Sequence, residues 1–206
     1  MFIRKQIFAG SGVESLFLWG ARQTGKSTLL KQLFPDSLWF DLLKSDVFER
    51  LSKQPSQLRE IVSATQPEKP IVIDEVQTIP SLLNEVHWLI ENNHNRFILS
   101  GSSPRKILRT QANLLGGRAL RYELYPLVSN EIPDFDLVRA LNNGLLPRHY
   151  LSENPQKLIS GYIGSYLRDE IMAEARIRNV SAFSGFLESA AFSNGEMVNY
   201  SNIASE

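Results

Sequence analysis

The fold of this 206-residue chain is decided by the stretch Gly20-Ala21-Arg22-Gln23-Thr24-Gly25-Lys26-Ser27. It matches the pattern G-x-x-x-x-G-K-[ST], the P-loop, in which backbone N–H groups of a tight loop surround a phosphate. An apolar run at 16–19 precedes it and is typical of a buried strand, and an apolar-periodic run at 28–34 follows it and is typical of a helix. Because a helix N-terminus adds a partial positive charge, this order predicts an anion-binding loop rather than an ordinary glycine-rich turn.

Each position of the loop has an expected task. Lys26 is expected to reach the β- and γ-phosphates of a nucleotide, and the Ser27 hydroxyl is expected to ligate Mg²⁺. The predicted ligands are therefore ATP and Mg²⁺. The predicted nucleotide-binding residues are Gly20, Ala21, Arg22, Gln23, Thr24, Gly25, Lys26, Ser27 and Thr28.

The composition is that of an ordinary soluble domain, with 43% apolar and 21% charged residues. The 22 basic residues equal the 22 acidic ones, which argues against bulk attraction to nucleic acid or to a membrane. The chain has no cysteine, and no run approaches the roughly 18 apolar residues of a membrane-spanning helix. We therefore expect a cytoplasmic protein with no membrane partner. The three histidines are scattered without ligand spacing, so no transition-metal site is predicted.

Apolar runs alternate with helical patterns over the first part of the chain. Strands are predicted at 14–19, 38–42, 71–73, 97–99 and 119–124, with helices between them, one of them at about 104–115. The runs at 71–73 and 97–99 are apolar without alternation, as in a strand buried on both faces. The fold class predicted is α/β, a P-loop NTPase core with a parallel five-stranded sheet flanked by helices.

The pattern changes after Pro126, where no strong strand signal remains. Helices are predicted near 135–142, 155–176 and 180–192. We expect an ATPase core over 1–127 and a helical extension over 128–178. Ser201 could begin another helix that is cut off at Glu206, which leads us to expect a fragment of a longer protein.

Two adjacent carboxylates follow the third predicted strand. Asp74 is expected to hold Mg²⁺ through water, and Glu75 is a candidate general base for the water that attacks the γ-phosphate. The simpler alternative is a pair of solvated carboxylates at a strand end. With the P-loop present, the pair favours an ATPase of the additional-glutamate type over a small-molecule kinase.

Serine residues follow the fourth predicted strand, at 100, 102 and 103. If that strand lies beside the P-loop strand, a hydroxyl of Ser100, or else of Ser102, would point at the γ-phosphate or the attacking water. The alternative is a Gly/Ser turn before the next helix.

A basic stretch at 100–122 contains no Asp or Glu. Its arginine at 118 follows two glycines, so Arg118 is a candidate arginine finger, acting in cis or across a subunit boundary in a homo-oligomer. The other basic residues of the stretch are better explained as a solvated helix face. They are Arg105, Lys106, Arg109 and Arg121.

Six motifs extend over nearly the whole chain in a fixed order. They are Gly-Ala-Arg-Gln-Thr-Gly-Lys-Ser at 20–27, Ile-Asp-Glu-Val-Gln at 73–77, Leu-Ser-Gly-Ser-Ser at 99–103, Gly-Gly-Arg-Ala at 116–119, Glu-Leu-Tyr-Pro-Leu at 123–127 and Gly-Leu-Leu-Pro at 144–147. Together they resemble the prokaryotic AAA-type ATPases, ATP-binding proteins of unknown role. Two motifs depart from that family: the doubled glycine at 116–117 replaces a bulkier residue, and the family more often has Gly-Gly-Phe-Pro at 144–147.

The resemblance implies more than an ATPase core. In that family the core is followed by a winged-helix segment and then by a nuclease-like domain of unknown function. Residues 179–206 look like the incomplete beginning of the winged helix, and the nuclease-like domain is absent from this sequence.

Two functions follow from these observations. The first is an Mg²⁺-dependent ATPase whose turnover drives a conformational change. The second is a slow nucleotide-gated switch that controls a winged-helix module for DNA or a protein partner. A small-molecule kinase is the third and weakest alternative. The absence of an Asn-Lys-x-Asp stretch favours ATP over GTP.

Overall fold

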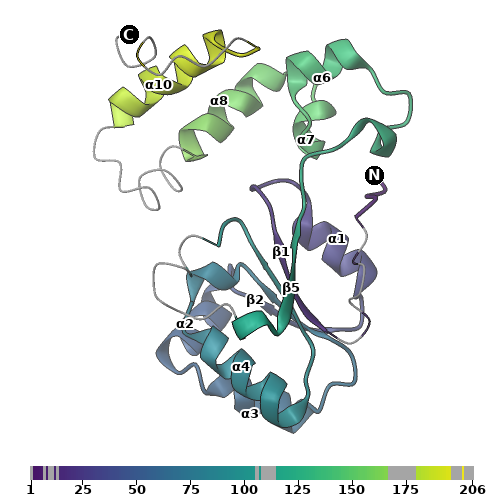
Figure 1. Cartoon of the computed structure of the whole chain (residues 1–206), viewed down its shortest axis with the longest axis vertical. Coiled ribbons are helices and arrows are strands. Elements are labelled where there is room, and N and C mark those ends of the chain that lie inside the picture. Colours follow the sequence, from purple (N-terminus) through teal and green to yellow (C-terminus); the bar gives the residue numbers. More distant parts are fainter. Residues whose placement is uncertain are drawn as a thin grey trace. The chain divides into compact units, whose positions relative to one another are not determined.

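The computed structural model describes residues 2–6, 8, 12, 14–104, 107, 115–166, 180–195 and 201. The chain divides into two compact units, Met1–Ser152 and Glu153–Glu206. Figure 1 shows the elements of each unit. Residues 128–152, predicted to belong to a helical extension, are part of the first unit.

The first unit is built on a five-stranded parallel sheet with the order β2-β3-β4-β1-β5. Its strands are β1 (Ser15–Trp19), β2 (Leu38–Asp41), β3 (Ile71–Asp74), β4 (Phe97–Gly101) and β5 (Ala119–Glu123). The predicted fold class is confirmed. The order places β4 directly beside β1 and between β1 and β3, so the ends of these three strands meet at one edge of the sheet.

Helices connect the parallel strands, as crossovers in a parallel sheet require. They are α1 (Lys26–Leu33), α2 (Ser45–Lys53), α3 (Gln57–Thr65) and α4 (Leu82–Asn93), with the short 3₁₀ turn η1 (Val76–Thr78) between β3 and α4. The predicted helix at about 104–115 lies largely outside the described residues, and so do Arg105, Lys106 and Arg109. The described chain resumes with the 3₁₀ turn η2 (Leu115–Gly117) before β5.

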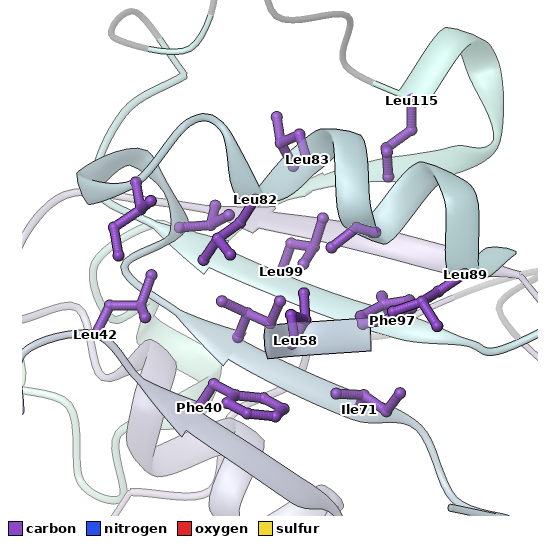
Figure 2. Close-up of a cluster of buried hydrophobic side chains, with 14 of the residues drawn as sticks. Phe40, Leu42, Leu58, Ile71, Leu82, Leu83, Leu89, Phe97, Leu99 and Leu115 are labelled. Atoms are coloured by element: carbon purple, nitrogen blue, oxygen red, sulfur yellow. The ribbon is translucent and has the colours of Figure 1, made fainter. Parts of the chain in front are cut away.

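Both faces of the sheet are buried, because successive side chains of a strand point to opposite faces. In β1, Phe17 packs into the larger cluster with α2, α3 and α4, and Leu16 packs into the smaller cluster with α1. Figure 2 shows the larger cluster, with Leu82, Leu83 and Leu89 of α4 beside side chains of the strands. The central strands are therefore fully covered, as the runs without alternation predicted.

The chain after β5 forms a third, smaller apolar cluster. Its elements are the 3₁₀ turn η3 (Ser129–Glu131), α6 (Leu137–Asn143) and the short α7 (Pro147–Tyr150). Leu127, Ile132 and Tyr150 form its buried centre, and Phe2 from the N-terminal segment packs against them. The N-terminal segment is thereby tied to residues more than 120 positions later in the sequence.

The described part of the second unit consists mainly of α8 (Pro155–Tyr166) and α10 (Val180–Phe192). The predicted helix at 155–176 is described only as far as Tyr166, and the one at 180–192 agrees with α10. Residues 196–200 and 202–206 are outside the description, so the winged helix stays a prediction. No helix among the described residues is long and apolar enough to cross a membrane.

Candidate functional site

The P-loop joins the end of β1 to the start of α1. At its first position a side chain has no room, because a Cβ on Gly20 would lie 2.3 Å from the carbonyl oxygen of Leu124, at the end of β5. At its second glycine, Gly25 caps α1 with a φ of +94°, a conformation that L side chains rarely adopt. Both glycines of the motif are therefore required by the local backbone, and the N-terminus of α1 opens towards the loop.

Lys26 is folded into the curve of the loop. Only 5% of the residue is exposed, and its Nζ donates hydrogen bonds to the carbonyl oxygens of Gly20 at 2.7 Å and Ala21 at 3.2 Å. The Nζ group therefore lies inside the curve of the loop. Phosphate oxygens entering the loop could replace these carbonyls as the partners of Nζ.

Asp74 at the end of β3 is the centre of a small network of buried oxygen atoms. Its Oδ2 accepts a hydrogen bond from the Ser27 hydroxyl at 2.5 Å, and its Oδ1 accepts one from the Ser100 hydroxyl of β4. The backbone N–H of Glu75 also donates to Oδ1, at 3.1 Å. Three elements thus meet at the carboxylate of Asp74, a residue that is 4% exposed.

The donor set at Asp74 fits Mg²⁺. Hydroxyl and carboxylate oxygens are the ligands that Mg²⁺ takes, and the ion usually keeps several waters and binds one or two protein groups together with phosphates. Ser27 and Asp74 are the two side chains that would hold it. The described residues contain no group of three or more His, Cys, Asp or Glu that could hold a metal ion.

Ser100 contacts Asp74 and lies fully buried. The condition set for this residue is met, because β4 lies beside the P-loop strand β1 and Leu18 pairs with Ser100. The predicted direction of the Ser100 hydroxyl is not found, because that hydroxyl is used on Asp74 and the residue does not line the open cleft at the loop.

That cleft has a volume of about 540 Å³ and is bordered by the loop on one side and by Glu75 on the other. Its lining residues are Arg22, Gln23, Gly25, Lys26, Ser27, Thr28, Leu43, Glu75 and Pro147. Glu75 therefore lines the same space as Lys26 and Ser27, which begin α1.

Arg118 lies at the opposite edge of the sheet. It precedes β5, and the register pairs Ser15 with Ala119 at that edge and Trp19 with Glu123 at the P-loop edge. The five residues of β5 separate Arg118 from the loop by roughly 16 Å along the strand. Its Nε pairs with Glu91 of α4. A residue before a parallel strand lies at the edge away from the loop, so the structure does not bring Arg118 to the cleft within one copy of the chain. Its action on the γ-phosphate stays a prediction.

Arg4 is a residue of this region that the sequence did not reveal. Its guanidinium donates to the carbonyl oxygen of Thr24 in the P-loop at 2.6 Å, to that of Tyr125 at 2.7 Å and to Oε2 of Glu131 at 3.0 Å. The side chains of Arg4 and Glu131 are 7% and 4% exposed. A buried cation thus ties the loop to the segment after β5, which we call the Arg4 clamp, formed by Arg4 and Glu131.

The carboxylate of the clamp is held by further donors. The backbone N–H groups of Lys5 and Val128 donate to Glu131 at 2.6 Å and 3.2 Å. Burial alone would raise the pKa of Glu131, but the hydrogen bonds from Lys5, Arg4 and Val128 outweigh it and hold the pKa below its ordinary value. No sequence signal marks this pair, since Arg4 lies in an irregular segment and 127 positions separate the partners.

A second, smaller cleft adjoins the first. It has a volume of about 220 Å³, and it shares Gly25, Thr28 and Pro147 with the larger cleft. The remaining lining is partly apolar and comes from the N-terminal segment, the P-loop, α1, and α7 with the residue that follows it. These residues are Phe2, Arg4, Thr24, Leu29, Gln32, Arg148 and Leu151.

The parallel sheet, the loop between β1 and α1 and the buried Ser27–Asp74 contact define a P-loop nucleotide-binding protein. The chain belongs to the AAA domain family, whose model matches residues 13–133, more than half of the chain. A second family model, a domain of unknown function (DUF8612), matches residues 134–206. No curated protein matches the chain.

Proposed function

We propose that this protein is an Mg²⁺-dependent ATPase of the additional-glutamate type. The observation that carries the proposal is the cleft of about 540 Å³, which Lys26, Ser27 and Glu75 line together. A phosphate-binding lysine, a metal-binding hydroxyl and a carboxylate that can accept a proton from water are the three groups that hydrolysis of a nucleoside triphosphate requires.

The side chains would divide the reaction as follows. Lys26 would exchange the carbonyls of Gly20 and Ala21 for the β- and γ-phosphates. When bound, Mg²⁺ neutralises phosphate charge, and Ser27 and Asp74 would hold it. Glu75 would take a proton from water as the water oxygen attacks the γ-phosphorus and the bond to the β–γ bridging oxygen breaks, giving ADP and phosphate.

Ser100 takes a different place in this proposal from the one predicted. Its hydroxyl would fix the orientation of Asp74, so that Oδ2 stays directed at Ser27. Ser100 is then a positioning residue rather than a sensor of the γ-phosphate.

The smaller, partly apolar cleft would hold the nucleobase. It begins where the phosphate-binding cleft ends, at Gly25 and Thr28, and Phe2 offers an aromatic surface beside Leu29. A ligand with a charged end and a flat apolar end matches two adjoining clefts of these characters.

The test is the pair of variants Glu75→Gln and Lys26→Ala. Glu75→Gln keeps the size of the side chain and removes the base, so ATP hydrolysis should fall by about 10²–10⁴-fold while the Kd for Mg-ATP stays near the wild-type value. Lys26→Ala should abolish nucleotide binding. The matched control is Glu68→Gln, at an exposed carboxylate beyond the other end of β3, and it should change neither quantity.

Each result has a distinct meaning. Wild-type turnover in Glu75→Gln would contradict the additional-glutamate mechanism, and unchanged affinity in Lys26→Ala would contradict the assignment of the loop. Tight ATP binding with no measurable turnover in the wild-type protein would favour the nucleotide-gated switch. Transfer of phosphate to a small acceptor would favour a kinase.

A further inference from the structure

Gln77 is a buried polar side chain beside Glu75 that the proposed reaction leaves without a role. It lies in η1, two residues after Glu75, and 5% of it is exposed. Its amide Nε2 donates a hydrogen bond to Oε2 of Glu75 and a second, at 3.2 Å, to the hydroxyl of Ser102. A continuous connection therefore leads from Ser102, just after β4, through Gln77 to Glu75.

The room for the Gln77 amide exists because residue 101 is glycine. A Cβ on Gly101 would lie 2.1 Å from Oε1 of Gln77 and 2.7 Å from the ring of Trp19. Gly101 ends β4 and Trp19 ends β1, and the two residues are paired in the sheet. The amide is thus enclosed by the ends of two central strands.

The backbone of Glu75 is fixed independently of its side chain. The residue has φ 59° and ψ 42°, a left-handed conformation that is uncommon outside glycine. Its carbonyl oxygen accepts hydrogen bonds from the backbone N–H of Thr78 at 2.9 Å and from the Thr78 hydroxyl at 2.8 Å. With the backbone held, the direction of the carboxylate depends on its side-chain torsions, and Gln77 restrains these.

We propose that Gln77 is the positioning residue of the general base, oriented in turn by Ser102. This inference rests on the proposed ATPase function. By holding Oε2 of Glu75, Gln77 leaves Oε1 to receive the proton of the attacking water. Rotation of the carboxylate away from the water would lower kcat for ATP hydrolysis. It would change the affinity for Mg-ATP little, since Lys26, the loop amides and Mg²⁺ hold the nucleotide.

Gln77→Met tests the inference, because methionine has nearly the same shape and removes the hydrogen bonds. The kcat for ATP hydrolysis should fall by about 10- to 100-fold, with KM and the Kd for Mg-ATP unchanged. Ser102→Ala should lower kcat in the same direction by about two- to tenfold, the effect of one lost hydrogen bond. The control is Gln57→Met, at an exposed amide of α3 that pairs with Gln54.

A double variant separates positioning from a general structural role. If Gln77 acts through Glu75, then Glu75→Gln with Gln77→Met should be no slower than Glu75→Gln alone. A multiplicative loss in the double variant would overturn the inference, as would a wild-type or raised kcat in Gln77→Met. If Gln77→Met does not fold, Ser102→Ala decides, and a wild-type kcat there overturns the inference. Failure of the proposed function has a different result, wild-type turnover in Glu75→Gln itself.

Discussion

Removing the Phe2 side chain should weaken binding of the nucleobase and leave binding of the phosphates unchanged. It lines the smaller cleft and packs edge-on against Tyr150, with the ring centroids 6.2 Å apart. Phe2→Ala should weaken ATP binding by about tenfold, the effect of losing one stacked ring, and leave the affinity for inorganic triphosphate unchanged. Competition binding with the two ligands measures this. An equal loss for both would place the base elsewhere.

The Arg4 clamp predicts a stability that depends on pH. The folded-state pKa of Glu131 is lowered, so its contribution is fully present above the unfolded value of about 4.3. It is lost as the pH falls from there through the folded-state pKa, because the unfolded state then binds the proton first. The free energy of unfolding, measured with urea, should therefore fall in this pH window for the wild-type protein. It should fall less for Glu131→Gln, which has no carboxylate at this position.

Removing the cation of the clamp is expected to be more severe. Arg4→Met leaves a buried carboxylate without its partner, which costs about 3–5 kcal/mol. Tryptophan fluorescence is a suitable signal, since all three tryptophans belong to the first unit. A loss below about 1 kcal/mol would mean that the two ions are solvated rather than clamped.

At the scale of elements, the same substitution should have opposite effects in a loop and in a helix. Gly20→Ala brings a Cβ against the backbone of Leu124, and overpacking of this kind costs about 1–3 kcal/mol. Gly161→Ala in the middle of α8 meets nothing within 4 Å and should stabilise that helix by about 0.5–1 kcal/mol. Urea unfolding reports the first change and hydrogen exchange of α8 reports the second. A neutral Gly20→Ala would mean that β5 can shift away from the loop.

The elements themselves were largely predictable from local sequence. The strands β1, β3 and β4 are apolar runs without alternation, and their burial on both faces follows from that pattern. The short helix α7 was not predicted, because four residues give no periodicity. The order of the strands was not predictable either, since it depends on contacts between distant segments.

The site was predictable where it depends on strand ends. The P-loop follows β1, and Asp74 and Glu75 lie at the end of β3. The carboxyl ends of neighbouring parallel strands meet at one edge of the sheet. The same rule places Arg118 at the other edge, because it precedes its strand. The partner of Ser100 and the Arg4 clamp were beyond prediction, since each depends on side-chain contacts across the fold.

At the scale of the whole molecule, the position of Arg118 restricts how copies of the chain could cooperate. The P-loop and Arg118 lie at opposite edges of one sheet. If Arg118 acts as an arginine finger on the site of another copy, the two copies must therefore contact each other head to tail. We expect a mixture of Arg118→Ala and Lys26→Ala proteins to recover ATP hydrolysis that neither variant shows alone. A mixture of Arg121→Ala and Lys26→Ala is the control. Absence of recovery would leave Arg118 with its structural pairing to Glu91.

The Arg4 clamp also has a consequence for the order of events during synthesis. The partner of Arg4 lies 127 positions further along the chain. At about 5–20 residues per second, Glu131 follows Arg4 by roughly 6–25 s. During that interval the carbonyl of Thr24 lacks its guanidinium, and β5 is not yet available to enclose Gly20. A nascent chain therefore carries the complete P-loop sequence before the contacts that enclose the loop can form.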